Sequence, residues 1–113
     1  MRRTLVVGNW FLVFALIASA GMANAQDAAK GQEVYTAQKC SVCHSIAGKG
    51  NKANPLDTVG TKLTAADIRA WIVTPVEAAA KAKSTKKPPM PAKYGKLAAA
   101  DLDALVAYMQ SLK

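Results

Sequence analysis

Apolar residues recur at helical spacing in several stretches of this chain, and glycine, proline and lysine are concentrated between them. The clearest stretch is residues 98–112, whose apolar positions are Leu102, Leu105, Val106, Met109 and Leu112. This spacing gives a helix one continuous apolar face. Ala98 lacks the side-chain oxygen preferred at a helix N-terminus, so we expect the first turn to be weakly held.

An earlier stretch predicts a helix over 28–38, with Asp27 as its N-cap. Its apolar face consists of Gly31, Val34 and Tyr35. Glycine inside a helix costs ~1 kcal/mol relative to alanine. We therefore interpret Gly31 as the point where another helix crosses too closely for a side chain.

Two shorter helices are expected in the middle of the chain. Thr64 and Asp67 have the spacing of a capping box, in which two side chains satisfy free amides of the first turn. Ile68, Trp71 and Ile72 then lie on one face.

Pro75 ends that helix and suits the first position of the next one, which is expected over 76–83. Thr74 and Glu77 repeat the capping-box spacing. Residues 45–61 read as a long loop, and the prolines within 84–96 forbid regular helix there. No strand pattern is seen, so the predicted fold class is all-α.

The N-terminus has the pattern of an export signal. Arg2 and Arg3 precede a mostly apolar run, and Ala23-Asn24-Ala25 matches an A-x-A cleavage site. The dense apolar run is shorter than the ~20 residues of a spanning helix, which argues against the alternative of a retained membrane anchor. We expect residues 1–25 to be a signal peptide, residues 26–113 to be one domain, and the location to be periplasmic.

The whole chain has 113 residues, with 15 Lys+Arg, 7 Asp+Glu, one His and two Cys. This length excludes large two-domain enzymes. Two cysteines and one histidine are too few for a four-ligand zinc site or a disulfide-dense scaffold. A domain of this size buries little surface, so we expect a further group to complete its core.

The segment Cys40-Ser41-Val42-Cys43-His44 has the c-type haem attachment pattern. Two thiols at this spacing can add to the two vinyl groups of a haem, and the adjacent imidazole then becomes an iron ligand. The alternatives are a thioredoxin-like redox pair, a zinc site and a disulfide. They are disfavoured by the missing strands, the missing second ligand pair and the very small loop that a disulfide would close.

The sixth iron ligand must come from elsewhere in the chain or from solvent. The candidates are Met90, Met109, a lysine or water. Met109 sits at a core position of a helix, where packing explains it. Met90 lies among Pro88, Pro89 and Pro91, which fix the backbone direction, and it is the expected thioether ligand.

The order of these features resembles class I c-type cytochromes, the small monohaem cytochromes c. The resemblance extends from about Gly31 to Leu112 and implies a cytochrome c fold, with about four helices around one covalent haem c attached through Cys40 and Cys43. The stretch between Pro75 and Met90 is longer than in the mitochondrial form.

The resemblance also implies roles for single residues. Gly31 and Tyr35 would cross Leu105 and Tyr108. The carbonyl of Pro55 would accept a hydrogen bond from Nδ1 of His44. Trp71 would pack on the haem near the Met90 side.

The implied function is one-electron transfer between redox proteins, without enzymatic activity. Six lysines bracket Met90 and can steer an acidic partner: Lys81, Lys83, Lys86, Lys87, Lys93 and Lys96. We expect a monomer, no nucleic-acid partner and no stable membrane insertion after cleavage. The alternatives are a haem subunit of an oxidoreductase complex and an open-site peroxidase or gas sensor.

Overall fold

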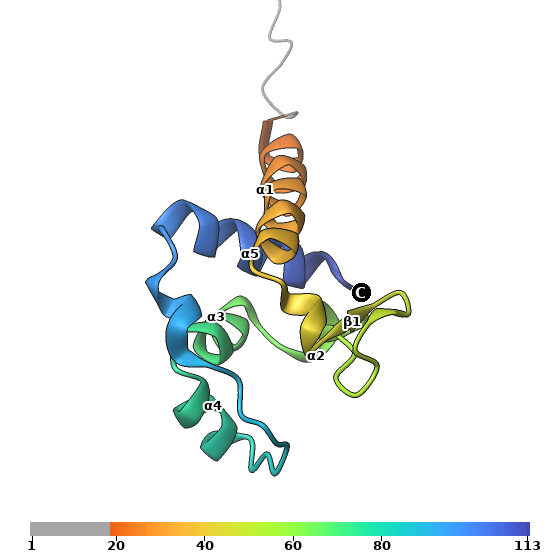
Figure 1. Cartoon of the computed structure of the whole chain (residues 1–113). Coiled ribbons are helices and arrows are strands. Elements are labelled where there is room, and N and C mark those ends of the chain that lie inside the picture. Colours follow the sequence, from red (N-terminus) through yellow and green to blue (C-terminus); the bar gives the residue numbers. More distant parts are fainter. Residues whose placement is uncertain (1–18) are drawn as a thin grey trace, which may run out of the picture.

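The computed structural model describes the chain from residue 19 to 113, and the side chains from residue 27 onward (Figure 1). Residues 1–18 of the expected signal peptide lie outside the described residues. The helices are α1 (Ser19–Ala37), α2 (Val59–Lys62), α3 (Ala65–Val73), α4 (Pro75–Lys81) and α5 (Ala99–Ser111), with two 3₁₀ turns, η1 (Cys40–Val42) and η2 (Ala92–Lys96). The predicted all-α class is confirmed.

Helices α1 and α5 cross each other (Figure 1), and Gly31 lies at the crossing. A Cβ at Gly31 would lie 2.5 Å from Cβ of Tyr108 and 2.7 Å from the carbonyl carbon of Ala104. One turn further on, the rings of Tyr35 and Tyr108 meet edge to face with their centroids 5.8 Å apart. The expected close crossing at Gly31 is therefore confirmed, because no side chain fits between the two backbones.

The hydrophobic core lies where α1, α3 and α5 meet. Its buried members are Val34, Tyr35, Ile68, Ile72, Leu102, Leu105, Val106 and Met109. Tyr35 and Leu105 share this cluster, as the sequence suggested. No side chain in the described part of the chain falls below 2 % exposure. The protein part of the core is therefore thin, as expected of a domain that holds an additional group.

Helix α1 begins earlier than predicted, at Ser19 instead of Ala28. Asp27 consequently lies inside the helix and is not its N-cap. The alanine-rich residues before Asp27 have high helix propensity, and in the uncleaved chain they continue the helix. The sequence-based boundary depended on Asp27 as the N-cap, and that prediction is wrong.

The two predicted capping boxes have different outcomes. At α3, Thr64 Oγ1 accepts from the Asp67 amide at 3.2 Å, and the Asp67 carboxylate accepts from the Thr64 amide at 3.3 Å. At α4, Thr74 makes no side-chain cap. Its hydroxyl instead donates to the carbonyl of Ala70 at 3.2 Å. The second box was wrong because Thr74 also ends α3, and its hydroxyl is used by that helix.

The predicted loop over 45–61 contains unpredicted structure. Strands β1 (Ser45–Ile46) and β2 (Lys49–Gly50) form a small antiparallel hairpin. Its turn residues Ala47 and Gly48 both have positive φ, as the tight turns that suit twisted strands require. Helix α2 follows, and its Gly60 amide donates to the carbonyl of Leu112 at 2.8 Å. Strands β1 and β2 are too short to give an alternating pattern in the sequence.

In the part of the chain that the structure describes, no helix has the length and apolar character needed to cross a membrane.

Candidate functional site

Cys40 is the first residue of the short turn η1, which follows α1, and Cys43 comes directly after the turn. Lys39, in the left-handed region with φ 56°, ends the α-helical path before this turn. The amides of Cys43 and His44 then both donate to the carbonyl of Cys40, at 3.1 and 2.9 Å. These two hydrogen bonds close a tight turn that joins the residue with the first thiol to the residue with the imidazole.

Both thiols are free. Cys40 is half-buried and packs against the core, whereas Cys43 is exposed. Burial raises the pKa of the Cys40 thiol, with a smaller opposing effect of a backbone hydrogen bond. Cys40 therefore packs against the apolar interior, and this burial disfavours its thiolate form.

Two asparagines hold the backbone of this turn in place. The Asn51 amide donates to the carbonyls of Ser41 and His44, both at 3.0 Å. The Asn51 side chain donates to the carbonyl of Val42 at 3.2 Å, and the Asn54 side chain donates to that of Cys43 at 3.0 Å. Four consecutive carbonyls are thus bonded, which fixes the orientation of the whole segment.

The imidazole of His44 is oriented by the backbone of Asn54. Its Nδ1 donates to the carbonyl of Asn54 at 3.1 Å. Burial lowers the pKa of His44, the hydrogen bond to Asn54 opposes this, and the Lys86 charge lowers it further. A neutral imidazole with its proton on Nδ1 presents the lone pair of Nε2 as a metal ligand.

The acceptor expected for this hydrogen bond was the carbonyl of Pro55, and that expectation is wrong by one residue. Ser45 and Pro55 form a parallel bridge. In it, the Ser45 amide donates to the carbonyl of Asn54, and the Leu56 amide donates to that of Ser45. This pairing turns the Asn54 carbonyl toward the residues around His44. Pro55 fits the bridge because the bridge requires no amide from it.

The other expected site residues lie in different parts of the fold. Met90 is half-buried and packs against the same core cluster as Cys40. Trp71 is half-buried on α3. Met109 is 6 % exposed within the core, which agrees with a packing role.

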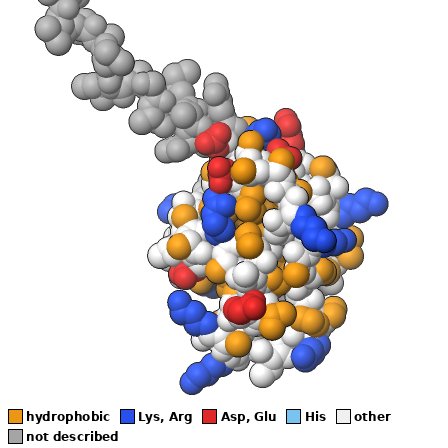
Figure 2. All heavy atoms as spheres, turned by 90° about the vertical axis from the view of Figure 1, so that its left-hand side faces the viewer, with side chains coloured by type: hydrophobic (Ala, Val, Ile, Leu, Met, Phe, Trp, Pro, Cys, Tyr) orange, Lys and Arg blue, Asp and Glu red, His pale blue; other side chains and the backbone are white. Residues whose placement is uncertain are grey.

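The six lysines expected to surround the site are all exposed. Lysines and arginines are spread around the face shown in Figure 2, with apolar side chains between them. Lys93 lies over the ring of Tyr94, 5.2 Å from its centroid. Lys86 differs from the other five lysines, because its Nζ donates to the carbonyl of Ala53 at 2.9 Å.

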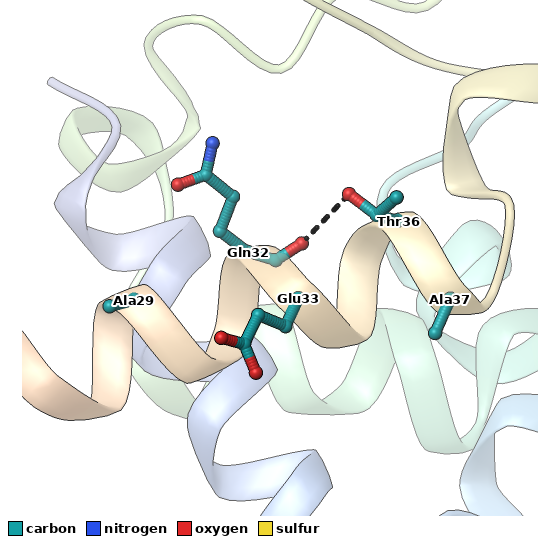
Figure 3. A pocket seen from close by; sticks show the side chains of 5 residues that line it. All are labelled: Ala29, Gln32, Glu33, Thr36 and Ala37. Carbon is teal, nitrogen blue, oxygen red and sulfur yellow. Dashed lines mark hydrogen bonds between the residues drawn. The ribbon is translucent and has the colours of Figure 1, made fainter.

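A separate shallow hollow lies along α1 and contains none of the expected site residues. It is lined by Ala29, Gln32, Glu33, Thr36 and Ala37 (Figure 3). Thr36 Oγ1 donates to the carbonyl of Gln32 there at 3.1 Å, as helical threonines often do. The hollow is open, and its residues give no sign of the chemistry found around His44.

The residues around η1 fit a covalently attached haem. Two free thiols lie three positions apart, one facing the core and one exposed. The adjacent imidazole is fixed in the tautomer that leaves Nε2 free. A helical domain with these groups in one turn is a small haem-binding protein.

Comparison with known proteins supports the assignment as a small haem-binding protein. The chain matches the cytochrome c family model over residues 28–113. It therefore belongs to the cytochrome c family, as a class I c-type cytochrome whose cofactor is haem c, attached through Cys40 and Cys43.

A curated relative is cytochrome c2 of Blastochloris viridis, 49 % identical over 47 residues, which are 41 % of this chain and 35 % of that protein. The matched part thus spans about a third of the relative's length. No solved structure gives a significant match.

Sequence reasoning missed Asn51 and Asn54 altogether, and it missed the contact that Lys86 makes with Ala53. Asparagine is common in loops because its side chain bonds to nearby backbone. That preference gave no reason to connect either asparagine to a segment about ten positions earlier. Lys86 was expected only to be one of the lysines that steer an acidic partner, and its hydrogen bond to Ala53 was not foreseen.

Proposed function

We propose that this protein is a periplasmic one-electron carrier in which His44 and Met90 are the axial ligands of the haem iron. The observation that carries the proposal is that Met90 and Cys40 pack against one core cluster. The likeness to a cytochrome c2 supports it. When bound, the haem supplies one-electron chemistry at its iron.

The residues of this chain would hold and orient the two proposed iron ligands. Burial lowers the pKa of His44, and the carbonyl of Asn54 orients its ring through Nδ1. Met90 is presented by a proline-rich segment that has few accessible backbone conformations. With both axial positions filled by side chains, the site has no open position for a substrate. Little rearrangement then accompanies a change of charge, which suits electron transfer rather than catalysis.

Ligation is tested by comparing two methionine variants. Met90→Leu should lose the sulfur-to-iron charge-transfer band and bind carbon monoxide in the reduced state. Met109→Leu, a near volume-conserving change in the core, should retain the band. A wild-type protein without this band would contradict Met90 ligation and favour the open-site peroxidase or sensor.

The oligomeric state of the purified protein distinguishes a free carrier from a subunit of an oxidoreductase complex. A free carrier should run as a monomer and exchange electrons with more than one acidic partner. Permanent association with one catalytic subunit after gentle purification would contradict the carrier proposal.

We also propose that residues 1–25 are removed on export. The intact mass of the exported protein should then correspond to a chain that begins at Gln26 plus one haem. A chain that retains residues 1–25 would contradict cleavage.

The proposed docking surface consists of the exposed lysines that bracket Met90. Replacing Lys87 and Lys93 with glutamine should slow association with an acidic redox protein at low salt and weaken its salt dependence. Lys62→Gln, at the end of α2, is the control. Equal effects at Lys62 would indicate only a general effect of net charge.

A further inference from the structure

Two segments that flank the site are joined by one side chain. The ammonium of Lys86 donates to the carbonyl of Ala53 at 2.9 Å, across 33 residues of sequence. Ala53 directly precedes Asn54, whose own carbonyl holds His44. Lys86 begins the segment that leads through the prolines to Met90.

We propose that Lys86 is a positioning residue that ties the Met90 segment to the Asn54 segment and so sets the relative placement of the two axial-ligand sides. The relevance to iron ligation depends on the proposed role of Met90. The tie itself does not, because it is a contact between two parts of the protein.

The Ala53 end of this contact is anchored. The Ala53 amide donates to the side chain of Asn51 at 3.0 Å. The Asn51 amide in turn donates to the carbonyls of Ser41 and His44. The carbonyl that receives Lys86 therefore belongs to a segment already fixed to the haem-attachment turn.

The Lys86 end is also constrained. Its amide lies 3.4 Å from Ser84 Oγ, and the Ser84 amide donates to the carbonyl of Ala79 in α4 at 2.9 Å. Pro88, Pro89 and Pro91 follow, and each has a fixed φ. Displacement at Lys86 is therefore passed along a stiff segment to Met90.

The same contact distinguishes Lys86 from its neighbour Lys87. Both are exposed, but Lys87 makes no hydrogen bond within residues 27–113. A charged donor on a carbonyl is stronger than a neutral one. We infer that Lys87 is available to a partner, whereas Lys86 serves first to hold the two segments together.

The test uses the full haem-loaded protein and the variants Lys86→Ala, Lys86→Gln and Lys87→Ala. Both alanine variants lose one charge, so Lys87→Ala is a matched control. The readout is amide hydrogen exchange of residues 51–56, because three prolines leave few amides near Met90. Lys86→Ala should speed exchange there by about fivefold, Lys86→Gln by less, and Lys87→Ala should have no effect. Equal exchange in Lys86→Ala and Lys87→Ala would overturn the proposal.

A second readout connects the tie to Met90. In a denaturant titration, Lys86→Ala should lose the sulfur-to-iron band at a lower denaturant concentration than Lys87→Ala does. Coincident midpoints would overturn the positioning role. If the wild type has no such band, Met90 ligation fails, while hydrogen exchange still decides whether the tie exists.

Discussion

The backbone carbonyl of Asn54 accepts a hydrogen bond from Nδ1 of His44 at 3.1 Å, and the side chain of Asn54 donates to the carbonyl of Cys43 at 3.0 Å. One loop residue thus orients the imidazole and holds the backbone just before it. The imidazole contact uses the backbone and survives substitution of the side chain. The two functions of Asn54 can therefore be separated by mutation.

Asn54→Ala should remove only the side-chain bond to Cys43. We expect a loss of about 1 kcal/mol in the free energy of unfolding, measured by denaturant titration of the haem-loaded protein. Lys52→Ala, an exposed change in the same loop, is the control and should have little effect. Unchanged stability in Asn54→Ala would show that the bond to Cys43 contributes nothing.

Gly31→Ala should destabilise the protein although alanine favours helix. The new methyl group would meet the backbone of α5 at Ala104 and Cβ of Tyr108, so the two helices must separate. We expect the steric cost to exceed the ~1 kcal/mol gained in helix propensity and to leave a net loss on the order of 2 kcal/mol. Gln32→Ala, on the exposed side of α1, should be near neutral. A stabilised Gly31→Ala variant would contradict the close crossing.

Tyr35→Phe tests an isolated buried hydroxyl. The Tyr35 oxygen is buried without a hydrogen-bond partner in the described structure. Removing it should leave stability at neutral pH unchanged or raise it by up to about 1 kcal/mol, measured as the unfolding midpoint. A clear loss of stability would mean that this hydroxyl has a partner in the haem-loaded protein.

The same residue predicts a dependence on alkaline pH. Burial raises the pKa of Tyr35 to about 12, with smaller contributions from charge at Cys40, Tyr108 and Asp57. The burial effect persists when Cys40 is a thioether. Between pH 10 and 12 the unfolded chain loses the proton while the folded chain keeps it, so stability falls as pH rises.

Wild-type stability should therefore decrease by on the order of 1–2 kcal/mol more than that of Tyr35→Phe over this interval. Below pH 10 the free energies of unfolding of the two proteins should change with pH in the same way. Tyr94→Phe, at a half-buried tyrosine, is the comparison variant. Identical slopes for the wild type and Tyr35→Phe would contradict the raised pKa.

The caps of α3 and α4 predict unequal effects of the same substitution. Thr64→Ala should cost about 1 kcal/mol because it removes a formed capping bond. Thr74→Ala should cost less, because its hydroxyl caps nothing at α4 and bonds only to the Ala70 carbonyl. Thermal unfolding of both variants measures the difference. A larger loss of stability in Thr74→Ala than in Thr64→Ala would contradict the assignment of the formed cap to Thr64.

Local patterns predicted much of this structure. The capping box at Thr64, the proline start of α4 and the apolar face of α5 depend on residues within one or two turns. Helix α1 was placed correctly except at its beginning, because Asp27 was taken as the N-cap and lies inside the helix. The hairpin at Ser45 was missed because two-residue strands leave no periodic signal.

The sequence alone determined the haem-attachment segment, the all-α class and the need for a further group in the core. These follow from residue type and short-range spacing, which backbone geometry converts directly into local structure. Only the tertiary structure decided that Asn54 instead of Pro55 holds His44, and that Lys86 joins two loops. Such contacts depend on where distant segments meet, and a shift of one residue in a loop exchanges one carbonyl for the next.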